Sequence, residues 1–212
     1  MSAPARIIVV ILALCLLPGP ARAMRIRSSV TLLAWSTDGE SLLLLQEEHG
    51  PEGGGSSTYL VVGTRPPRAV SATVSSDFSP GDGSTPERVP VKACEQGLRQ
   101  VERALRKLGI KGVAVHVKRC AGKDRAGLVT PKTAPPRNVL AVSKGKTVAV
   151  GLKQGRVAVS GPDGVEARLS PGAKVVLVLK DMNGDRMLQG VYRRRGAAFE
   201  RVQLRRPKGG KW

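Results

Sequence analysis

The sequence predicts a mainly β fold of the α+β kind: an antiparallel β meander or sandwich with one α-helix at about 91–108. Aromatic residues make up 3% of the chain, so valine and leucine have to form most of the core. The 25 glycines and 15 prolines favour short strands separated by turns. Leu98, Val101, Leu105 and Leu108 recur at helical spacing, and this spacing predicts the helix.

The N-terminal segment has the pattern of a secretory signal peptide. Arg6 supplies a positive charge, and an unbroken apolar run follows it from 7 to 17. A Pro-Gly-Pro break then precedes the small residues Ala21 and Ala23, which fits cleavage between Ala23 and Met24. We therefore expect residues 1–23 to be removed and the rest of the chain to be exported, to the periplasm or as a secreted protein.

Two other interpretations of this segment fit less well. An uncleaved membrane anchor needs about 20 apolar residues, and this run has roughly half that number. A lipoprotein signal would use Cys15, but a large leucine precedes this cysteine, which lies inside the apolar run. No other stretch is apolar enough to cross a bilayer, so we expect no transmembrane segment after signal removal.

The mature chain has a length that suits one ordinary domain or two very small ones. Segment 24–130 holds the predicted N-terminal hairpins and a helix–strand unit. Segment 131–137 ends a proline-containing connector that begins near residue 121, and segment 138–212 is the predicted meander. The sequence leaves open whether the two large segments share one core.

A strong turn signal lies in the N-terminal segment. Ser36-Thr37-Asp38-Gly39 separates two apolar runs, and Asp-Gly favours a tight hairpin. Composition and periodicity predict strands at 28–35, 40–46 and 58–63, with loops at 47–57 and 71–86.

Turn residues recur with unusual regularity in the C-terminal segment. Pairs such as Gln154-Gly155, Asn183-Gly184 and Arg195-Gly196 separate short valine-rich stretches. This spacing is typical of a sandwich, a curved sheet or a small barrel. The expected strands are 139–143, 147–152, 156–160, 164–169, 174–181, 186–193 and 198–204.

The residues Trp35-Ser36-Thr37-Asp38-Gly39, followed by Leu42–Leu45, form a recognisable motif. This motif resembles the W-S-x-D-G blade motif of TolB-like and WD-repeat β-propellers. In that family the Asp-Gly turn joins two strands of a blade, and the aromatic ring packs between neighbouring blades. The resemblance occurs once, whereas a propeller needs four or more blades at a period of about 40 residues. It therefore implies a local hairpin of this kind.

Cys94 and Cys120 are the two cysteines that remain after signal removal. An even number of cysteines in an oxidising compartment predicts a disulfide. The helix from Cys94 to its end would measure about 21 Å, and a return strand through Val113 and Val115 about 23 Å. If the two run antiparallel, the cysteines meet, and the alternative is a pair of buried free thiols.

The best cluster of metal-type ligands is Glu47, His49 and Glu52 in the predicted glycine-rich loop. Carboxylate and imidazole groups suit zinc or a related divalent ion if the loop folds over. The competing interpretation is a solvated acidic loop, since three glycines follow and no second histidine completes a catalytic set.

A second acidic segment has the spacing of the start of a calcium loop, at Asp181, Asn183 and Asp185. A calcium loop carries a bidentate glutamate where this chain has Tyr192. Asn-Gly between two apolar stretches predicts a hairpin turn instead.

Other catalytic arrangements have little support in the sequence. A Ser-His-Asp triad would have to use His116 or His49, and no G-x-S-x-G elbow precedes a helix. A glycosidase-type carboxylate pair would draw on the predicted 71–86 loop and its flank, where the carboxylates Asp77, Asp82 and Glu87 are equally ordinary loop residues.

The chain is strongly basic, with a formal net charge of +19 that falls to +17 when Arg6 and Arg22 leave with the signal. The densest runs are Arg193-Arg194-Arg195 and the C-terminal tail. Export and the scarcity of stacking aromatics argue against nucleic acid. The expected partners are an anionic envelope polymer or lipid head groups, and the alternative is a basic protein with no such partner.

The leading hypothesis is an exported, non-enzymatic binding or structural protein of the cell envelope that needs no cofactor. One alternative is a secreted, metal-assisted hydrolase that uses the Glu47–Glu52 loop and His116. Another alternative is an assembly module that pairs with a partner by addition at a β-sheet edge.

Overall fold

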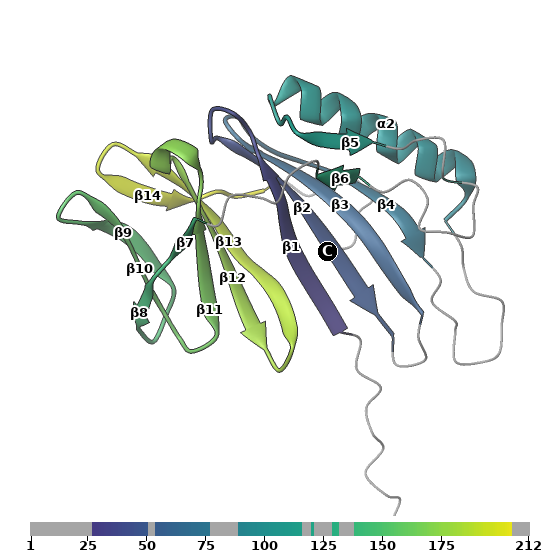
Figure 1. The fold of residues 1–212 in the computed structure, drawn as a ribbon. Coiled ribbons are helices and arrows are strands. Elements are labelled where there is room, and N and C mark those ends of the chain that lie inside the picture. The colour runs from purple at the N-terminus through teal and green to yellow at the C-terminus, as the bar shows by residue number, and fades with distance from the viewer. Residues whose placement is uncertain are drawn as a thin grey trace, which may run out of the picture.

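The computed structural model describes residues 27–50, 54–76, 89–115, 120, 129–131 and 138–204. Within these residues it confirms a mainly β fold with one α-helix (Figure 1). The predicted signal segment, its cleavage site at Ala23 and Met24, and the basic C-terminal tail lie outside the described residues.

The first four strands form an antiparallel meander in which each strand pairs with the next. The expected hairpin joins the first two strands, and Gly39 in its turn has a φ of +70°, a conformation that glycine adopts at little cost. The strands are β1 (Arg27–Trp35), β2 (Ser41–His49), β3 (Gly55–Thr64) and β4 (Pro67–Ser76).

Two predicted loops in this unit are largely strand. β2 continues to His49 and β3 begins at Gly55, so the loop prediction for 47–57 is wrong over most of its length. β4 extends to residue 76, although serine-rich composition predicted a loop from residue 71. Ala72 and Val74 alternate with polar residues and are buried against the helix, as in a strand with one covered face.

The helix α2 (Val91–Lys107) lies where the apolar spacing predicted it. Its buried residues face the sheet, and Gly109, with a φ of +63°, follows its end. The chain then forms β5 (Val113–Val115), which pairs antiparallel with β6 (Val129–Pro131), a strand within the predicted connector. The buried residues of the helix are Cys94, Leu98, Val101 and Leu105.

The C-terminal segment forms a second meander and a separate three-stranded sheet. Its strands are β7 (Val139–Leu140), β8 (Val142–Lys144), β9 (Ala149–Lys153), β10 (Arg156–Gly161), β11 (Val165–Leu169), β12 (Val175–Met182), β13 (Asp185–Arg195) and β14 (Ala198–Arg201). Strands β11 to β14 are antiparallel neighbours, and a short 3-10 turn, η2 (Pro171–Ala173), precedes β12. The separate sheet has the order β8-β10-β9.

The two meanders join into one nine-stranded sheet because β1 pairs with β13 in parallel, with Ser29 opposite Arg186. The backbone N–H of Ser28 also donates to Oδ1 of the buried Asp185, at 3.2 Å. A second parallel pair joins β8 to β10. The sheet is therefore mixed, since parallel pairs form between strands that are far enough apart in the sequence to allow a crossover.

Three apolar clusters stabilise this arrangement. The first lies between α2 and β1–β4. The second joins both meanders, with Trp35 and Leu44 from one and Leu177 and Val191 from the other. The third lies between β11–β14 and the three-stranded sheet. Figure 1 shows α2 at one end of the molecule and the β8-β10-β9 sheet at the other.

Candidate functional site

Two of the three predicted metal ligands lie on β2. Glu47 and His49 are two residues apart on this strand, so they point to the same face of the sheet. Glu52 lies outside the described residues. Among the residues that are described, no three His, Cys, Asp or Glu side chains come together in a group that could hold a metal ion.

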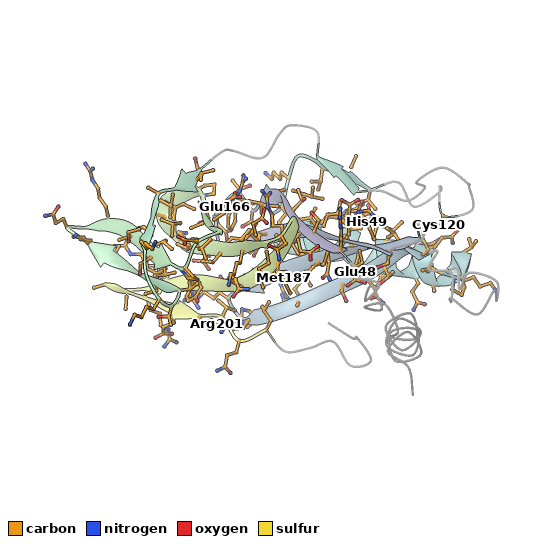
Figure 2. All side chains as sticks on the ribbon, turned by 90° about the horizontal axis from the view of Figure 1, so that it is seen from below. Glu48, His49, Cys120, Glu166, Met187 and Arg201 are labelled. Atoms are coloured by element: carbon orange, nitrogen blue, oxygen red, sulfur yellow. A yellow bond between two sulfur atoms is a disulfide. The ribbon has the colours of Figure 1, made fainter. Side chains whose placement is uncertain are left out.

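Glu48, which lies between these two residues in the sequence, forms hydrogen bonds on the other face of β2. Its two oxygens accept hydrogen bonds from Gln46 Nε2 at 3.0 Å and from Ser56 Oγ at 3.2 Å. Figure 2 labels Glu48 and His49 on the part of the sheet near the end of β2, apart from Arg201. The hydrogen bond from Ser56 therefore links the side chain of Glu48 on β2 to β3.

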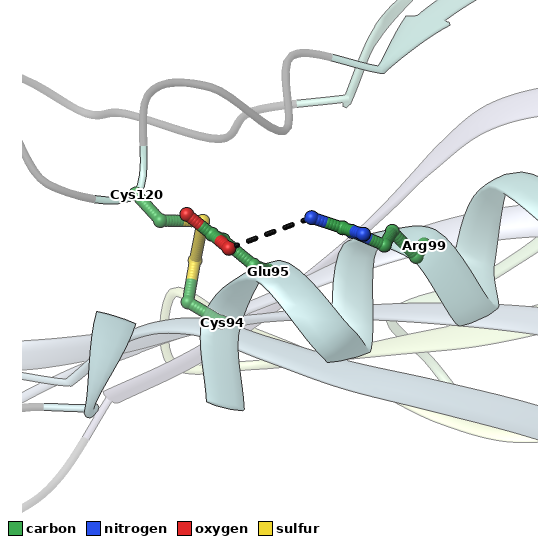
Figure 3. Close-up of a disulfide and its surroundings, with 4 residues drawn as sticks. All are labelled: Cys94, Glu95, Arg99 and Cys120. Carbon is green, nitrogen blue, oxygen red and sulfur yellow. Dashed lines mark ion pairs between the residues drawn. A yellow bond between two sulfur atoms is a disulfide. The ribbon is translucent and has the colours of Figure 1, made fainter. Parts of the chain in front are cut away.

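The predicted disulfide is present. Cys94, on the first turns of α2, is bonded to Cys120, and their Cα atoms are 6.0 Å apart (Figure 3). Glu95 forms an ion pair with Arg99 one turn along the helix, at 3.6 Å. The bond links the helix to residue 120, beyond β5, and confirms the predicted pairing of the two cysteines. Residues 116–119 of the predicted return strand lie outside the described residues.

The acidic segment at 181–185 is a hairpin turn between β12 and β13. Asn183 and Gly184 have φ values of 58° and 85°, and the N–H of Gly184 donates to Asp181 Oδ1 at 3.1 Å. The turn predicted by Asn-Gly is therefore confirmed. The other candidates for catalysis, His116, Asp77, Asp82 and Glu87, lie outside the described residues.

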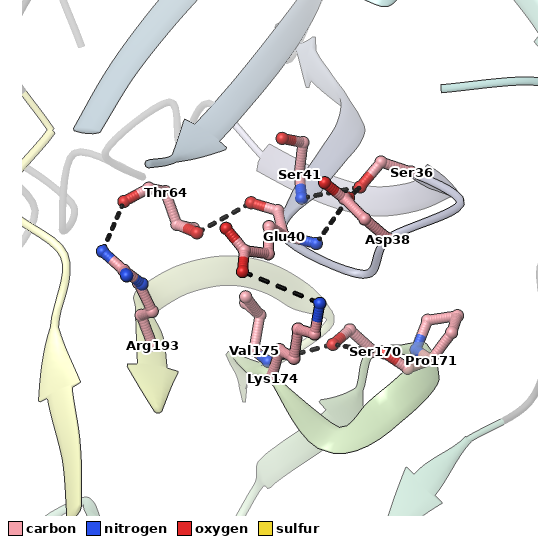
Figure 4. Close-up of polar contacts among 10 residues, drawn as sticks. All are labelled: Ser36, Asp38, Glu40, Ser41, Thr64, Ser170, Pro171, Lys174, Val175 and Arg193. Carbon is pink, nitrogen blue, oxygen red and sulfur yellow. Dashed lines mark hydrogen bonds and ion pairs between the residues drawn. The ribbon is translucent and has the colours of Figure 1, made fainter. Parts of the chain in front are cut away.

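A polar cluster of the buried Ser36 and Ser41 with the exposed Asp38 stabilises the turn between β1 and β2 (Figure 4). The Ser36 hydroxyl donates to Asp38 Oδ1 at 2.5 Å and accepts the N–H of Ser41 at 2.8 Å. The N–H of Glu40 also donates to Asp38, at 3.0 Å. The bond from Ser36 is the largest cause of a lowered pKa at Asp38, followed by the bond from Glu40.

This Ser–Asp pair has a structural role in the turn. The Ser36 side chain is 1% exposed, and its hydroxyl is committed to a carboxylate and to a backbone N–H. A nucleophilic serine needs a base that takes its proton and an open path to the substrate. These hydrogen bonds instead fix the hairpin.

Residues 170–175 form a turn that packs against the first one. The N–H of Val175 donates to Ser170 Oγ at 2.9 Å, and Lys174 forms an ion pair with Glu40 at 3.7 Å. A Cβ on Gly39 would lie 2.1 Å from the carbonyl oxygen of Pro171, so only glycine fits there. Two segments that are distant in the sequence thus form one end of the shared core.

The most distinctive surface is cationic and comes from two hairpins. We call it the basic tip cluster, and it consists of Lys153, Arg156, Arg194, Arg195 and Arg201, all of them exposed. Four of these residues flank the β9–β10 turn and the β13–β14 turn, and Arg201 lies further along β14, opposite Tyr192. Strand β14 contacts β9. Both hairpins project from the same end of the molecule (Figure 1).

The third apolar cluster holds these hairpins together. Phe199 of β14 packs against the same core as Val150 and Val157 of β9 and β10. Within the described hairpins the nearby carboxylate is Glu200, which pairs with Arg195 at 3.4 Å. Lys153 and Arg156 have no ion-pair partner among the described residues, so the cluster carries a large positive excess.

The sequence indicated only part of this cluster. The Arg193–Arg195 run stands out in the sequence, whereas Lys153 and Arg156 are isolated cations that flank a predicted turn. The useful signal would have been that both predicted turns, Gln154-Gly155 and Arg195-Gly196, are flanked by cations. The contact between the two hairpins depends on core packing, which the sequence pattern does not specify.

An open groove of about 360 Å³ borders the cluster. It lies between residues 188–191 of β13 and residues 201–204, and Gln189, Arg201 and Gln203 are among the residues that line it. Arg201 also donates to the carbonyl oxygen of Gln189 at 2.7 Å. The groove therefore offers amide groups beside a guanidinium group.

Comparison of the chain with protein-family models, with curated proteins and with solved structures gives no match. Within the described residues, no helix is long and apolar enough to cross a membrane. The site has to be interpreted from its own geometry and charge.

Proposed function

We propose that this protein is an exported, non-enzymatic protein that binds an anionic polymer or anionic lipid head groups through the basic tip cluster. The observation that carries the proposal is the charge imbalance of the paired hairpins. Five exposed cations share this surface with one carboxylate, Glu200. Ligands with repeated phosphate, sulfate or carboxylate groups have the matching charge.

The chemistry of the cluster supports such a ligand. Three of its five cations, Arg156, Arg194 and Arg195, are arginines on the hairpin tips, and a guanidinium group binds phosphate or carboxylate with two parallel hydrogen bonds. The cations lie on paired strands that pack against the third apolar cluster, so little ordering of the backbone is needed on binding. Strong dependence on salt is expected, because the charges are exposed to solvent.

Export is supported by two features. The signal-like N-terminal sequence directs a chain out of the cytosol. The Cys94–Cys120 bond is of the kind that persists in oxidising compartments. An anionic ligand of the envelope or cell surface would be accessible there.

Retention on immobilised heparin tests this proposal. The double variant Lys153→Glu/Arg156→Glu should elute at clearly lower salt than the parent protein. The matched control, Arg103→Glu/Lys107→Glu, changes the net charge by the same amount on the exposed side of α2 and should elute close to the parent. Equal shifts for both variants would show that net charge, and not the cluster, determines binding.

A vesicle-binding experiment distinguishes a lipid ligand from a polymer ligand. Vesicles that contain phosphatidylglycerol should bind the protein if head groups are the ligand, with neutral phosphatidylcholine vesicles as the control. Retention on heparin without vesicle binding would assign the site to a polymer.

A further inference from the structure

We propose that the groove beside Arg201 is a subsite for one sugar ring of an acidic polysaccharide, whose following units extend onto the basic tip cluster. This inference rests on the proposed function and specifies its ligand as a polymer of sugars that carry carboxylate groups. The groove lies between residues 188–191 of β13 and residues 201–204, and its volume is about 360 Å³. This volume is near the lower end of the range for ligand pockets, which suits a single ring with its substituents.

The groove forms where β13 changes its neighbour. Near its start β13 pairs with β1, at Arg186, and from Tyr192 onwards it pairs with β14. Residues 187–190 lie between these two pairings. In the pairing with β12, the register skips Gln189, which is therefore the extra residue of a β-bulge. A bulge bends its strand and interrupts the hydrogen-bond ladder, so the groove opens where the pairing of β13 is least regular.

The side chain of Arg201 is held at this groove by the bulge. Its Nη2 donates to the carbonyl oxygen of Gln189 at 2.7 Å. The buried Gly190 leaves space for it, because a Cβ at this position would lie 3.2 Å from Arg201 Nε and 3.0 Å from the ring of Tyr192. The glycine in the bulged segment therefore allows the guanidinium group to lie close to the strand.

The charge of Arg201 is available to a ligand. Arg201 is exposed, and among the described residues no carboxylate forms an ion pair with it. The adjacent carboxylate, Glu200, pairs with Arg195 instead. The bond to Gln189 uses one of the several N–H donors of the guanidinium group. Donors therefore remain for the two oxygens of a carboxylate.

The residues that line the groove favour a sugar over a phosphate. Gln189 and Gln203 carry amide groups, which both donate and accept hydrogen bonds, as sugar hydroxyl groups do. Ionised phosphate and sulfate groups only accept, so they match Arg201 but not the amide oxygens. The remaining side chains of the lining are apolar and suit the C–H groups of a sugar ring. They belong to Leu188, Val191, Val202 and Leu204.

The groove continues into the basic tip cluster along β13 and β14. Tyr192 pairs with Arg201, and Arg194, two residues further along β13, pairs with Phe199. Because side chains alternate along a strand, Arg194 and Arg201 project from the same face of the sheet, about 7 Å apart along the strands. A polysaccharide with one ring in the groove can therefore place a following carboxylate at Arg194.

Fluorescence anisotropy with two end-labelled ligands of equal charge, an oligogalacturonate and a linear polyphosphate, tests this proposal. The variant Gln189→Ala/Gln203→Ala removes both amides and leaves the net charge unchanged. It should bind the oligogalacturonate about tenfold more weakly than the parent, because hydrogen bonds are lost, and the polyphosphate as tightly as the parent. The matched control, Gln96→Ala/Gln100→Ala, changes two exposed positions of α2 and should bind both ligands like the parent.

The cluster variant Lys153→Glu/Arg156→Glu separates this inference from the proposed function. If this variant binds both ligands weakly while the double glutamine variant binds the oligogalacturonate like the parent, the sugar subsite is overturned and the cluster stands. A parent protein that binds neither ligand would contradict both. If the double glutamine variant fails to fold, Gln203→Ala alone decides, since this position is exposed. It should weaken oligogalacturonate binding about threefold or more, and unchanged binding would overturn the subsite.

Discussion

Ser36 and Ser170 occupy equivalent positions in two turns of the same construction. Each hydroxyl accepts the backbone N–H five residues later, from Ser41 at 2.8 Å and from Val175 at 2.9 Å. Each backbone N–H donates to the carbonyl of that same later residue, at 2.8 and 2.9 Å. The two segments differ in sequence, W-S-T-D-G-E-S-L against L-S-P-G-A-K-V-V, yet they form the same turn at the start of each meander.

The equivalence extends to the rest of each turn. Gly39 and Ala173, three residues after each serine, both donate to the serine carbonyl at 3.0 Å and both have a positive φ. The residues one position further on, Glu40 and Lys174, form the ion pair that joins the turns. The two meanders are therefore built on one local pattern and meet where that pattern is repeated.

Replacement of either serine by alanine should destabilise the fold. Ser36→Ala leaves the buried N–H of Ser41 without its acceptor, and Ser170→Ala does the same to Val175. Each loss should cost about 1–3 kcal/mol in the free energy of unfolding, measured by urea titration. Thr37→Ala removes only an exposed hydrogen bond to Gly109 and serves as the control. A serine variant as stable as this control would contradict the equivalence.

Gly39→Ala should be much more damaging than Gly184→Ala. Both glycines have a positive φ, but a Cβ at Gly39 meets the Pro171 carbonyl oxygen at 2.1 Å, whereas nothing lies within 4 Å of one at Gly184. The backbone conformation alone costs an alanine about 1–2 kcal/mol. Thermal unfolding should show a further loss of about 1–3 kcal/mol for Gly39→Ala, caused by displacement of the turn at 170–175. Equal losses would mean that the two turns do not pack as described.

Asp38 should contribute to the pH dependence of stability. The hydrogen bond from Ser36 lowers the pKa of Asp38 below its ordinary value of 3.8. A carboxylate with a lowered pKa in the folded state stabilises the fold above its unfolded pKa. This stabilisation is lost as the pH falls below 3.8 and through the lowered pKa of the folded state.

Asp38→Asn tests this pH dependence, because the amide keeps the acceptor oxygen without the charge. The free energy of unfolding, measured from neutral pH down into this acidic range, should fall less steeply for the variant than for the parent. Identical slopes would assign the acid sensitivity to other carboxylates.

Loss of the disulfide should weaken the attachment of the chain beyond β5 to the helix. The bond closes a loop of 26 residues in sequence separation. Cross-linking a loop of this size contributes about 3 kcal/mol through the unfolded state. The double variant Cys94→Ser/Cys120→Ser should show this loss in urea unfolding, and a reducing agent should lower the stability of the parent protein but not that of the variant. A parent protein unaffected by reduction would contradict a stabilising bond.

Local patterns in the sequence predicted most of the local structure. The helix, the C-terminal strands and the Asn183-Gly184 turn follow from spacing and turn residues, which act over a few positions. β4 was missed because its three serines resemble a loop in composition, and it is burial of Ala72 and Val74 under α2 that makes the segment a strand.

The features that depend on distant segments could not be predicted in the same way. The parallel pair of β1 and β13 joins residues 157 positions apart, and a hydrophobic pattern contains no information on such a partner. The same limit applies to the basic tip cluster, since the β9–β10 and β13–β14 hairpins come together only through the core around Phe199. The disulfide is an exception among the long-range contacts. The expected lengths of the helix and of the strand after it were enough to predict that Cys120 lies beside Cys94.

The most direct test of the proposed function is a map of the surface that an anionic chain touches. Backbone amide chemical shifts should be followed while a short polyphosphate is added to the protein at low salt. The account predicts that the largest changes fall on residues 153–156 and 194–201, with little change on the exposed residues of α2. Changes spread evenly over all exposed cations, or concentrated on α2, would contradict a binding site at the basic tip cluster.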